Sequence, residues 1–400
     1  TGGVLLEICL VDRVVTMSLQ RISIVIPFLL VHGLIAAEPV LPRTPRERIA
    51  ARTFPSVFQA WNPADNLKHE DKWTTLARHD LVFHAPDYFG LKWAGNFNGL
   101  ATAFTSQSLQ SAVATRKMLL NKNPNLILLA ELRYRDAHRS YLPDNHVWWK
   151  RKDGKPVVGW EEGGYFLLDF SNPAYRAHVA QQAKAIVDSG LFDGIMLDWW
   201  DDDPDRLALI KGIRDAIGDQ PLVLVNANDR KTPGTAAFVN GYFMECYKSK
   251  SVEDWRQIAE TLGWAESHLK EPRINCLETW FHKSRGDLQL MRATTTLSLT
   301  LSDGYCLFSD PNPLGTADHL HDWYPFWDRS LGRPKRKGER SGDGSIQRRF
   351  DRGLAVYNPA GNKPVEVKFT SPHTAASTGK SATSFTVPPG DGDLFHQEQN

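Results

Sequence analysis

The chain has 400 residues, of which 42% are hydrophobic and 23% charged, and its formal net charge at pH 7 is +1. This composition excludes a disordered chain, and the near-neutral charge gives no indication of binding to nucleic acid or to an anionic membrane. The length is enough for two or three average domains, although one α/β barrel alone uses roughly 250 residues.

The first segment of the chain has the features of a secretory signal. Met17 is followed by Arg21, by an apolar run from Ile22 to Ile35 and by two alanines. A charged start, a short apolar stretch and small residues at its end are typical of a cleaved signal peptide. The run is shorter than the ~20 residues that a membrane span needs. We therefore expect residues 1–37 to be an upstream segment and signal peptide, and the mature protein to be secreted or periplasmic without a stable membrane anchor.

From residue 54 onward, short apolar runs alternate with helical patterns. Runs such as Leu126–Ala130 and Leu222–Val225 are continuously hydrophobic, which is typical of parallel strands buried on both faces. The predicted strands are Phe54–Trp61, Leu81–Pro86, Asn125–Tyr134, Asp193–Trp200, Pro221–Asn228, Gly241–Tyr247, Arg273–Phe281 and Gly304–Asp310. The predicted helices are Ser106–Leu120, Pro173–Ser189, Pro204–Ile217, Val252–His268 and Asp287–Leu301.

Eight strands with helices between them predict an α/β fold of the (β/α)8 type, a TIM barrel. The alternative, a doubly wound open sheet, would need a Gly-rich phosphate turn after an early strand, and the sequence has none. After Asp310, short apolar runs separated by Gly and Pro predict antiparallel strands. The expected division is a catalytic barrel over residues 38–331, then a linker and a small C-terminal antiparallel β domain over residues 332–400.

The cysteines do not indicate a disulfide framework or a zinc site. Cys9 precedes the export signal, whereas Cys246, Cys276 and Cys306 each lie inside an apolar run. An odd number of cysteines at such spacing favours buried thiols in the core. We predict no cofactor and no bound metal, and we expect a monomer.

Carboxylates end three of the predicted strands, at Asp198, Glu245 and Glu278. In a barrel, the carboxyl ends of the strands converge on one mouth, and the alternation of side chains along a strand points these three toward the axis. A carboxylate after an apolar run is costly to bury unless it is paired, hydrogen-bonded or catalytic. Cleavage of a glycosidic bond needs two such groups with different pKa values. We predict Asp198 and Glu245 as the catalytic pair, with Glu278 as the reserve candidate.

Other side chains at the strand ends are candidates for positioning a substrate. Aromatic rings beside the acids would provide flat faces on which sugar rings stack, and Trp148, Trp149 and Trp160 would form a wall or lid. The predicted substrate-binding residues are His84, Glu131, Arg133, Trp199, Trp200, Asn226, Asn228, Trp280 and Asp310.

Three segments of the sequence resemble known barrel hydrolases: FDGIMLDWW at 192–200, NGYFMECY at 240–247 and RRFDRGLAVYNP at 348–359. They are similar to glycoside hydrolases of the hypothetical glycosyl hydrolase family 15 type and, more distantly, to endo-α-1,4-polygalactosaminidase-like barrels. In the latter, an Asp ending the fourth strand and a Glu ending the sixth are the proposed catalytic pair. The resemblance implies a carbohydrate substrate, with Asp198 as the nucleophile and Glu245 as the acid/base. It carries over neither the sugar nor the stereochemistry.

Two other functions remain open at this stage. The chain could be a carbohydrate-binding barrel without turnover, or a metal-assisted hydrolase that uses the Asp198–Asp205 cluster. Two carboxyl groups at about 5–9.5 Å across the mouth would favour hydrolysis of a glycoside, whereas several oxygens converging on one point would favour a metal. If the commoner pattern of acids on the fourth and seventh strands applied, Glu278 would replace Glu245.

Overall fold

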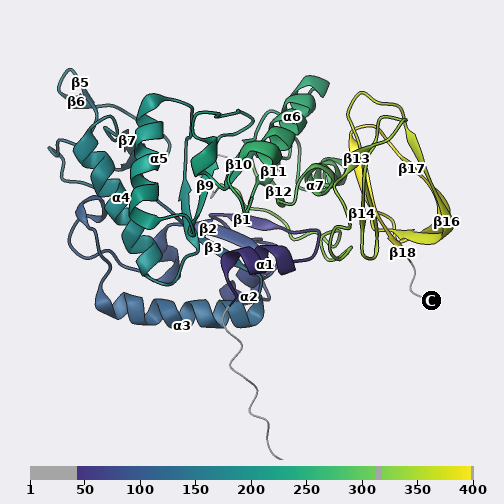
Figure 1. Ribbon diagram of the computed structural model, residues 1–400, viewed down its shortest axis with the longest axis horizontal. Helices are drawn as coiled ribbons and strands as arrows, with labels where there is room; N and C mark the ends of the chain where they lie inside the picture. Colours follow the sequence, from purple (N-terminus) through teal and green to yellow (C-terminus); the bar gives the residue numbers. More distant parts are fainter. Residues whose placement is uncertain (1–42, 312–317, 398–400) are drawn as a thin grey trace, which may run out of the picture. The chain divides into compact units, whose positions relative to one another are not determined.

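Eight parallel strands form a nearly closed barrel in the computed structural model, which describes residues 43–311 and 318–397 (Figure 1). The strands follow one another around the barrel in chain order, and a parallel bridge between Val57 and Cys306 joins the last strand to the first. This arrangement confirms the predicted (β/α)8 barrel. The strands are β1 (Phe58–Ala60), β2 (Leu81–His84), β3 (Ile127–Glu131), β8 (Gly194–Leu197), β9 (Leu222–Asn226), β10 (Gly241–Cys246), β11 (Cys276–Trp280) and β12 (Tyr305–Ser309).

Polar caps set where the helices around the barrel begin. Asn172 accepts a hydrogen bond from the backbone at the start of α4, ahead of a proline in the first turn, as its sequence pattern predicts. Asp203 caps α5 in the same way, and Ser251 caps α6 in a reciprocal pair with Asp254. The helices are α1 (Pro45–Ala51), α2 (Lys72–Ala77), α3 (Ser106–Lys122), α4 (Pro173–Asp188), α5 (Pro204–Ile217), α6 (Val252–His268) and α7 (Leu288–Leu301), with 3-10 turns η1 (Pro86–Phe89), η2 (Asn98–Leu100) and η3 (Ala236–Phe238).

An aromatic layer fills the barrel interior. The rings of Phe58, Phe83 and Phe243 are fully buried, and their centroids lie 5.2 to 6.1 Å apart. The ring of Trp61, which follows β1, packs on Phe83 and Phe243 at 4.9 and 5.9 Å. Because these rings fill the interior like the side-chain layers of other barrels, they form a packed floor beneath the strand ends.

A long excursion separates β3 from α4. Its antiparallel pairs are β4 (Asp136–His138) with β7 (Tyr165–Leu167) and β5 (Arg151–Lys152) with β6 (Lys155–Pro156). Trp149 is buried here and donates its indole N–H to the Pro143 carbonyl, so it packs the excursion. Trp160 instead lines the main cavity, in the role of wall predicted for this segment.

The C-terminal part of the chain forms a separate six-stranded antiparallel sheet in the order β13-β14-β15-β18-β16-β17. This sheet has a small apolar cluster of its own, which includes Val356, Val367 and Phe395. It confirms the predicted C-terminal β fold, although the exact domain boundaries stay a prediction. The strands are β13 (Glu339–Arg340), β14 (Ile346–Phe350), β15 (Gly353–Asn358), β16 (Val365–Ala375), β17 (Ser381–Val387) and β18 (Asp391–Gln397).

Helix α7 lies between the barrel and this sheet, in contact with β11 and β12 on one side and with β14, β15 and β18 on the other (Figure 1). Arg292 on α7 forms a two-point ion pair with Asp391, at 2.9 and 2.7 Å. A Cβ at Gly392 would collide with the Thr296 side chain, so the backbone of β18 approaches the helix as closely as only glycine permits. Helix α7 therefore packs against both the barrel and the C-terminal sheet.

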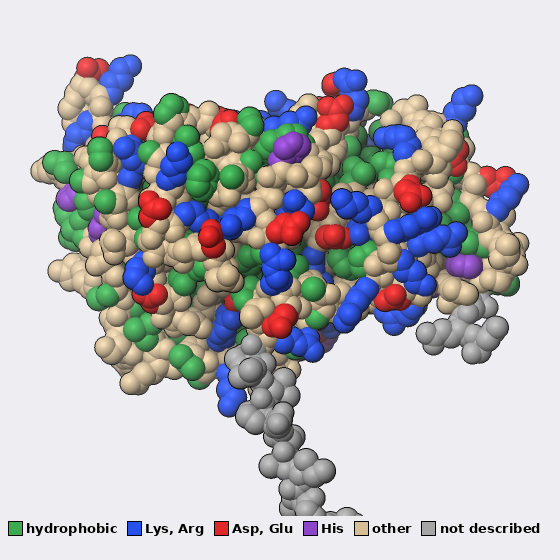
Figure 2. Space-filling view, viewed as in Figure 1, with side chains coloured by type: hydrophobic (Ala, Val, Ile, Leu, Met, Phe, Trp, Pro, Cys, Tyr) green, Lys and Arg blue, Asp and Glu red, His purple; other side chains and the backbone are tan. Residues whose placement is uncertain are grey.

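The three cysteines in the described part of the chain, Cys246, Cys276 and Cys306, are buried free thiols, as their apolar surroundings predict. No helix among the described residues is long and apolar enough to span a membrane. The predicted signal peptide lies outside the described residues. Acidic and basic side chains are interspersed over the face of the barrel seen in Figure 2.

Candidate active site

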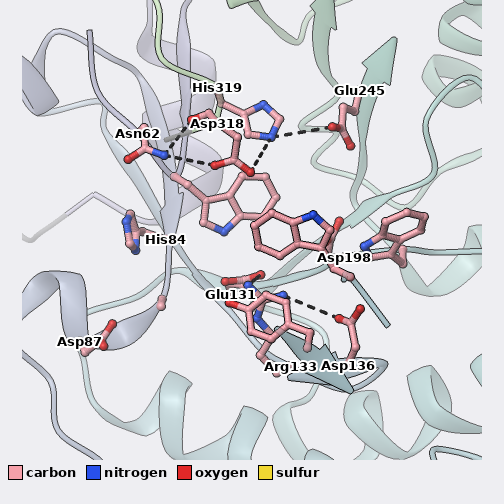
Figure 3. A pocket seen from close by; sticks show the side chains of 15 residues that line it. Asn62, His84, Asp87, Glu131, Arg133, Asp136, Asp198, Glu245, Asp318 and His319 are labelled. Atoms are coloured by element: carbon pink, nitrogen blue, oxygen red, sulfur yellow. Dashed lines mark hydrogen bonds and ion pairs between the residues drawn. The ribbon is translucent and has the colours of Figure 1, made fainter. Parts of the chain in front are cut away.

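A cavity of about 430 Å³ opens at the carboxyl ends of the barrel strands (Figure 3). The basic side chains in its lining are Arg133, His84 and His319. The carboxylates that line it outnumber these groups, so any occupant meets a strongly polar and acidic surface. The lining carboxylates are Asp87, Glu131, Asp136, Asp198, Glu245 and Asp318.

One amide group joins the two predicted catalytic acids. The side-chain nitrogen of Asn226, at the end of β9, donates to Oδ1 of Asp198 and to Oε2 of Glu245, both at 2.8 Å. The two carboxylate oxygens are therefore no farther apart than two hydrogen-bond lengths. Asp198 follows β8 and Glu245 lies on β10, so the three side chains come from three consecutive strands.

Burial shifts the pKa values of both acids upward, but their surroundings differ. The pKa of Glu245 is raised to about 8 by burial and by the charges of Glu278 and Asp198, although His319 and Asn226 oppose the shift. Burial also raises the pKa of Asp198, where the guanidinium of Arg133 and the Asn226 hydrogen bond favour the ionised form. The arrangement thus favours a proton on Glu245 at neutral pH, whereas Arg133 and Asn226 favour the ionised form of Asp198.

Arg133 lines the cavity, and its charge acts on Asp198. Its Nη2 lies 2.9 Å from Oε1 of Glu131, and its Nη1 lies 3.8 Å from Oδ1 of Asp136. The guanidinium also lies 4.8 Å from the centre of the Tyr165 ring. Burial raises the pKa of Glu131, whereas Arg133 lowers it. These contacts hold the positive charge of Arg133 beside Asp198, where it stabilises the ionised carboxylate.

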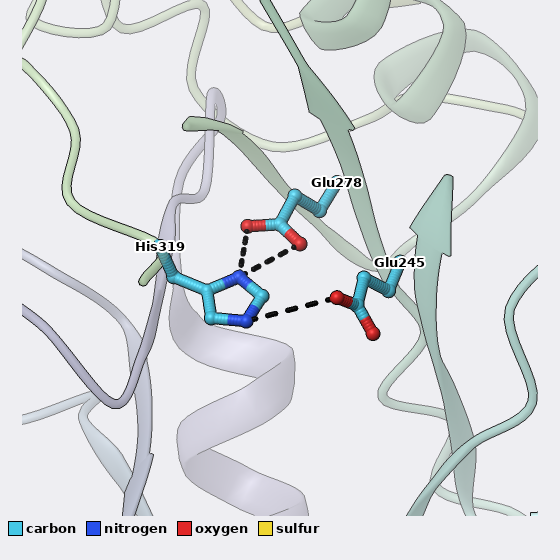
Figure 4. A group of neighbouring side chains, drawn as sticks. All are labelled: Glu245, Glu278 and His319. Atoms are coloured by element: carbon cyan, nitrogen blue, oxygen red, sulfur yellow. Dashed lines mark hydrogen bonds and ion pairs between the residues drawn. The ribbon is translucent and has the colours of Figure 1, made fainter. Parts of the chain in front are cut away.

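His319 faces Glu245 from the segment after β12, and the sequence analysis did not identify it. Its Nδ1 lies 2.9 and 3.1 Å from the two oxygens of Glu278, and its Nε2 lies 3.8 Å from Oε1 of Glu245 (Figure 4). Glu278 also accepts a 2.6 Å hydrogen bond from Ser309 and is fully buried. His319 lines the cavity and contacts Glu278, which does not line it. This geometry disfavours Glu278, the reserve candidate, as the partner of Asp198.

Trp199 and Trp200 occupy opposite environments, although both were predicted to bind substrate. Trp199 lines the cavity, is 46% exposed and lies beneath the guanidinium of Arg135 at 4.4 Å. Trp200 is fully buried and donates its indole N–H to Thr235, so it is a core residue and offers no face to a sugar. The predicted alternation fails because β8 ends at Leu197 and Trp199 adopts a left-handed φ of 55°.

His84 lines the cavity and stacks on the ring of Tyr88, with centroids 3.8 Å apart. Burial and the nearby Lys72 lower its pKa to about 4. A neutral imidazole can accept and donate hydrogen bonds, so His84 is suited to contact a hydroxyl group.

Asn226, which bridges the two acids, and three further predicted substrate residues lie outside the cavity lining. Asp310 is held by Arg285 in a two-point ion pair at 2.8 and 2.7 Å. Asn228 donates a hydrogen bond to the backbone carbonyl of Glu245, so it holds the backbone that carries this acid. Trp280 packs between Tyr247 and His319. The structure gives these residues supporting contacts and no direct access to a substrate in the cavity.

The acidic run after Asp198 does not converge on a metal. Asp203 caps α5, Asp205 pairs with Arg176, Asp201 pairs with Arg230, and Asp202 accepts from the Gly234 backbone. Among the residues that the structure describes, one group places metal-ligand types within 4.8 Å of one another, namely Glu245, Glu278 and His319. In this group Nδ1 of His319 is already hydrogen-bonded to Glu278, whereas its Nε2 lies 3.8 Å from Glu245, at the distance of an ion pair.

Comparison with known proteins supports the fold. No protein-family model and no curated protein matches the sequence. A noncanonic maltogenic alpha-amylase from Thermotoga neapolitana aligns with a TM-score of 0.51 and 11% identity over 85% of this chain and 98% of its own. An alpha-amylase from Malbranchea cinnamomea gives 0.51 and 11% over 88% and 97%, and one from Lactobacillus plantarum gives 0.51 and 10% over 89% and 100%. At such identity the likeness establishes a shared barrel architecture.

Proposed function

We propose that this chain is a glycoside hydrolase that cleaves O-glycosidic bonds in a poly- or oligosaccharide. The observation that carries the proposal is the Asn226 amide, which holds Asp198 and Glu245 together at the mouth of the barrel. Two partly buried carboxyl groups in one cavity, with the proton favoured on one of them, are the groups that hydrolysis of a glycosidic bond requires. Solved structures with the same fold are alpha-amylases by name, which agrees with a carbohydrate substrate.

In this proposal Asp198 is the nucleophile and Glu245 the general acid and base. The spacing of the two oxygens, at most two hydrogen-bond lengths, fits the ~5–5.5 Å found in retaining enzymes better than the ~6.5–9.5 Å of inverting ones. The electrostatics agree with these roles, because Arg133 favours the ionised form of Asp198 and burial favours the protonated form of Glu245.

The reaction then has two steps. In the first, Asp198 forms a bond to the anomeric carbon while the bond to the leaving oxygen breaks, and that oxygen takes the proton of Glu245. In the second, Glu245 takes a proton from water, the water oxygen bonds to the anomeric carbon, and the bond to Asp198 breaks. Both carboxyl groups return to their starting states, and the configuration of the sugar is retained.

The sequence resemblance supports the assignment of Asp198 and Glu245 as the catalytic pair. Segments 192–200, 240–247 and 348–359 resemble the hypothetical glycosyl hydrolase family 15 type and, more distantly, polygalactosaminidase-like barrels. In the latter, an Asp and a Glu at the same two strands form the proposed pair.

We include in the proposal the cleavage of a signal peptide near Ala37 and export of the mature chain.

The test begins with the mature protein, residues 38–400, and a panel of polysaccharides and 4-nitrophenyl glycosides. Release of reducing ends or nitrophenol identifies the substrate, and proton NMR of the first product identifies its anomeric configuration. We expect retention. An inverted product would contradict the assignment of Asp198 as a nucleophile, and binding without cleavage would favour a carbohydrate-binding barrel.

Variants then assign the roles. Asp198→Asn and Glu245→Gln nearly preserve shape, and each alone should lower turnover by at least about 10²–10⁴-fold. Asp203→Asn is the matched control, because asparagine caps a helix as well as aspartate does. A 2-deoxy-2-fluoro glycoside of the identified sugar should form an adduct on the peptide that contains Asp198. An adduct on Glu245 instead would reverse the two roles.

A further inference from the structure

His319 is buried between two carboxylates from neighbouring strands of the barrel. On one side, Nδ1 contacts both oxygens of Glu278 at 2.9 and 3.1 Å. On the other side, Nε2 lies 3.8 Å from Oε1 of Glu245 and 3.8 Å from Oδ2 of Asp318 (Figures 3 and 4). The two contacts of Nδ1 fit an N–H group that donates to the side chain of Glu278.

The surroundings fix the imidazole in this orientation. His319 adopts a left-handed φ of 56°, which is uncommon for a residue with a side chain. Its ring packs against Trp61, Phe243 and Trp280, with centroids 5.0, 5.8 and 6.3 Å away. Glu278 is itself held by the hydroxyl of Ser309 at 2.6 Å. Residues in rare backbone conformations persist only where the surrounding contacts hold them, and they cluster at functional sites.

The charges around the ring favour the imidazolium form. Burial would lower the pKa of His319, but the charge and hydrogen bond of Glu278, with the charges of Glu245 and Asp318, raise it to about 10. The neighbouring His321 is buried and its pKa is lowered to about 4, so it adds no positive charge at neutral pH. His319 is thus a cation among three carboxylates.

We propose that His319 is a positioning residue of the hydrolytic reaction, which keeps a fixed positive charge 3.8 Å from Glu245 and so stabilises that carboxylate after it has given up its proton. The inference rests on the proposed function, in which Glu245 is ionised only between the two steps. Glu278 and Ser309 hold the imidazolium in place, and His319 keeps both of its protons throughout. The positive charge keeps Glu245 ionised between the two steps, and the ionised form is the one that can accept a proton from water in the second step.

The first test measures the charge of His319 without any substrate. NMR of protein labelled with ¹⁵N and ¹³C in histidine follows the ring signals with pH, and His319→Gln assigns the His319 signal by its loss. We expect His319 to be an imidazolium at pH 7 and at pH 8. In Glu278→Gln, which keeps an acceptor oxygen but removes the charge, its pKa should fall by more than about one unit. A neutral His319 ring at pH 7 would overturn the proposal.

The second test measures the effect on Glu245 through the pH profile on the glycoside found in the panel. Without the imidazolium, the pKa of Glu245 should rise, so the alkaline limb of kcat/KM should move to higher pH by about one unit or more in His319→Gln. The second step should slow, so a dinitrophenyl glycoside should give a burst that the wild type lacks. His268→Gln, an exposed histidine on α6, is the control with a wild-type profile.

The outcomes separate this inference from the proposed function. If His319→Gln keeps the wild-type alkaline limb, the role of His319 is wrong even though the enzyme is a glycosidase. If no glycan is cleaved by the wild type, the proposed function fails, while the NMR titration still reports the charge of His319. If His319→Gln does not fold, Glu278→Gln decides the matter. One histidine ring that is charged at pH 8 in the wild type should then show a lowered pKa, and a variant in which no histidine pKa falls would overturn the proposed arrangement.

Discussion

Arg133 lies 2.9 Å from Glu131 through Nη2 and Oε1, and both side chains line the cavity beside Asp198. Glu131 is almost completely buried, so the pair holds the guanidinium in a place where solvent screens its charge weakly. The positive charge of Arg133 is the first influence after burial on the pKa of Asp198, and it lowers that pKa.

Replacing Arg133 with methionine should therefore raise the pKa of Asp198. A nucleophile must be ionised, so the acidic limb of kcat/KM should move to higher pH, by about one unit for the loss of one nearby charge. The measurement is the pH profile of Arg133→Met on the identified glycoside. Arg176→Met is the matched control, because Arg176 is also mostly buried and pairs with one aspartate, Asp205. An unchanged acidic limb in Arg133→Met would contradict the role given to Arg133.

The wild-type enzyme should lose activity as the pH rises through about 8, because Glu245 has a pKa of about 8 and must carry a proton to protonate the leaving oxygen. Below that pH the acid is in its active form until Asp198 becomes protonated. The check is kcat/KM measured from pH 4 to 10, with circular dichroism at each end to show that the fold persists. An alkaline limb near pH 5 would mean that Glu245 is not the acid.

The two adjacent tryptophans should respond in opposite ways to substitution. Trp199→Ala removes an exposed ring from the cavity, so KM should rise by about three- to tenfold, for a stacking contact of order 1 kcal/mol. Trp200→Phe removes a buried hydrogen bond to Thr235 and part of a fully buried ring. It should lower stability by about 2 kcal/mol and leave KM unchanged. Steady-state kinetics and thermal melts of both variants test this contrast, and a large KM effect from Trp200→Phe would contradict the assignment of that ring to the core.

The ion pair between Arg292 and Asp391 should stabilise the packing of the C-terminal sheet on α7. Both side chains are largely buried, at 19% and 7% exposure, so Arg292→Met leaves a buried carboxylate without its partner. We expect a loss of about 2 kcal/mol and a melting temperature lower by several degrees. The control is Arg256→Met, whose pair with Glu253 is exposed and should contribute little. Equal melting temperatures for the two variants would contradict this prediction.

The barrel and the two acids could be predicted from the sequence because both depend on local pattern. Continuous apolar runs mark buried parallel strands, and Asp198 and Glu245 stand at the ends of two of them, where the carboxyl ends of strands converge. Asn226 also ends a strand, but its position between the two acids depends on how β9 is aligned with β8 and β10. The sequence pattern of a single strand gives no information about that alignment.

The rest of the site depends on contacts between distant segments. His319 lies in an irregular segment after β12, where no periodicity points to the cavity, and only the folded chain brings it onto Glu278. Asp310 also follows a barrel strand, yet Arg285 holds it in an ion pair away from the cavity lining. Trp200 was predicted to face a substrate but lies in the core, because alternation holds only while the backbone stays extended, and a φ of 55° at Trp199 ends it.

Helix α7 has a consequence for the order in which the protein can be completed during synthesis. Its residues Ala293–Thr300 are all buried, and part of the cover comes from β18, which is among the last described residues to be translated. The C-terminal sheet must therefore be present before the outer side of α7 is covered. A chain that ends before β18 would leave that side of the helix exposed, which is the kind of surface that chaperones bind.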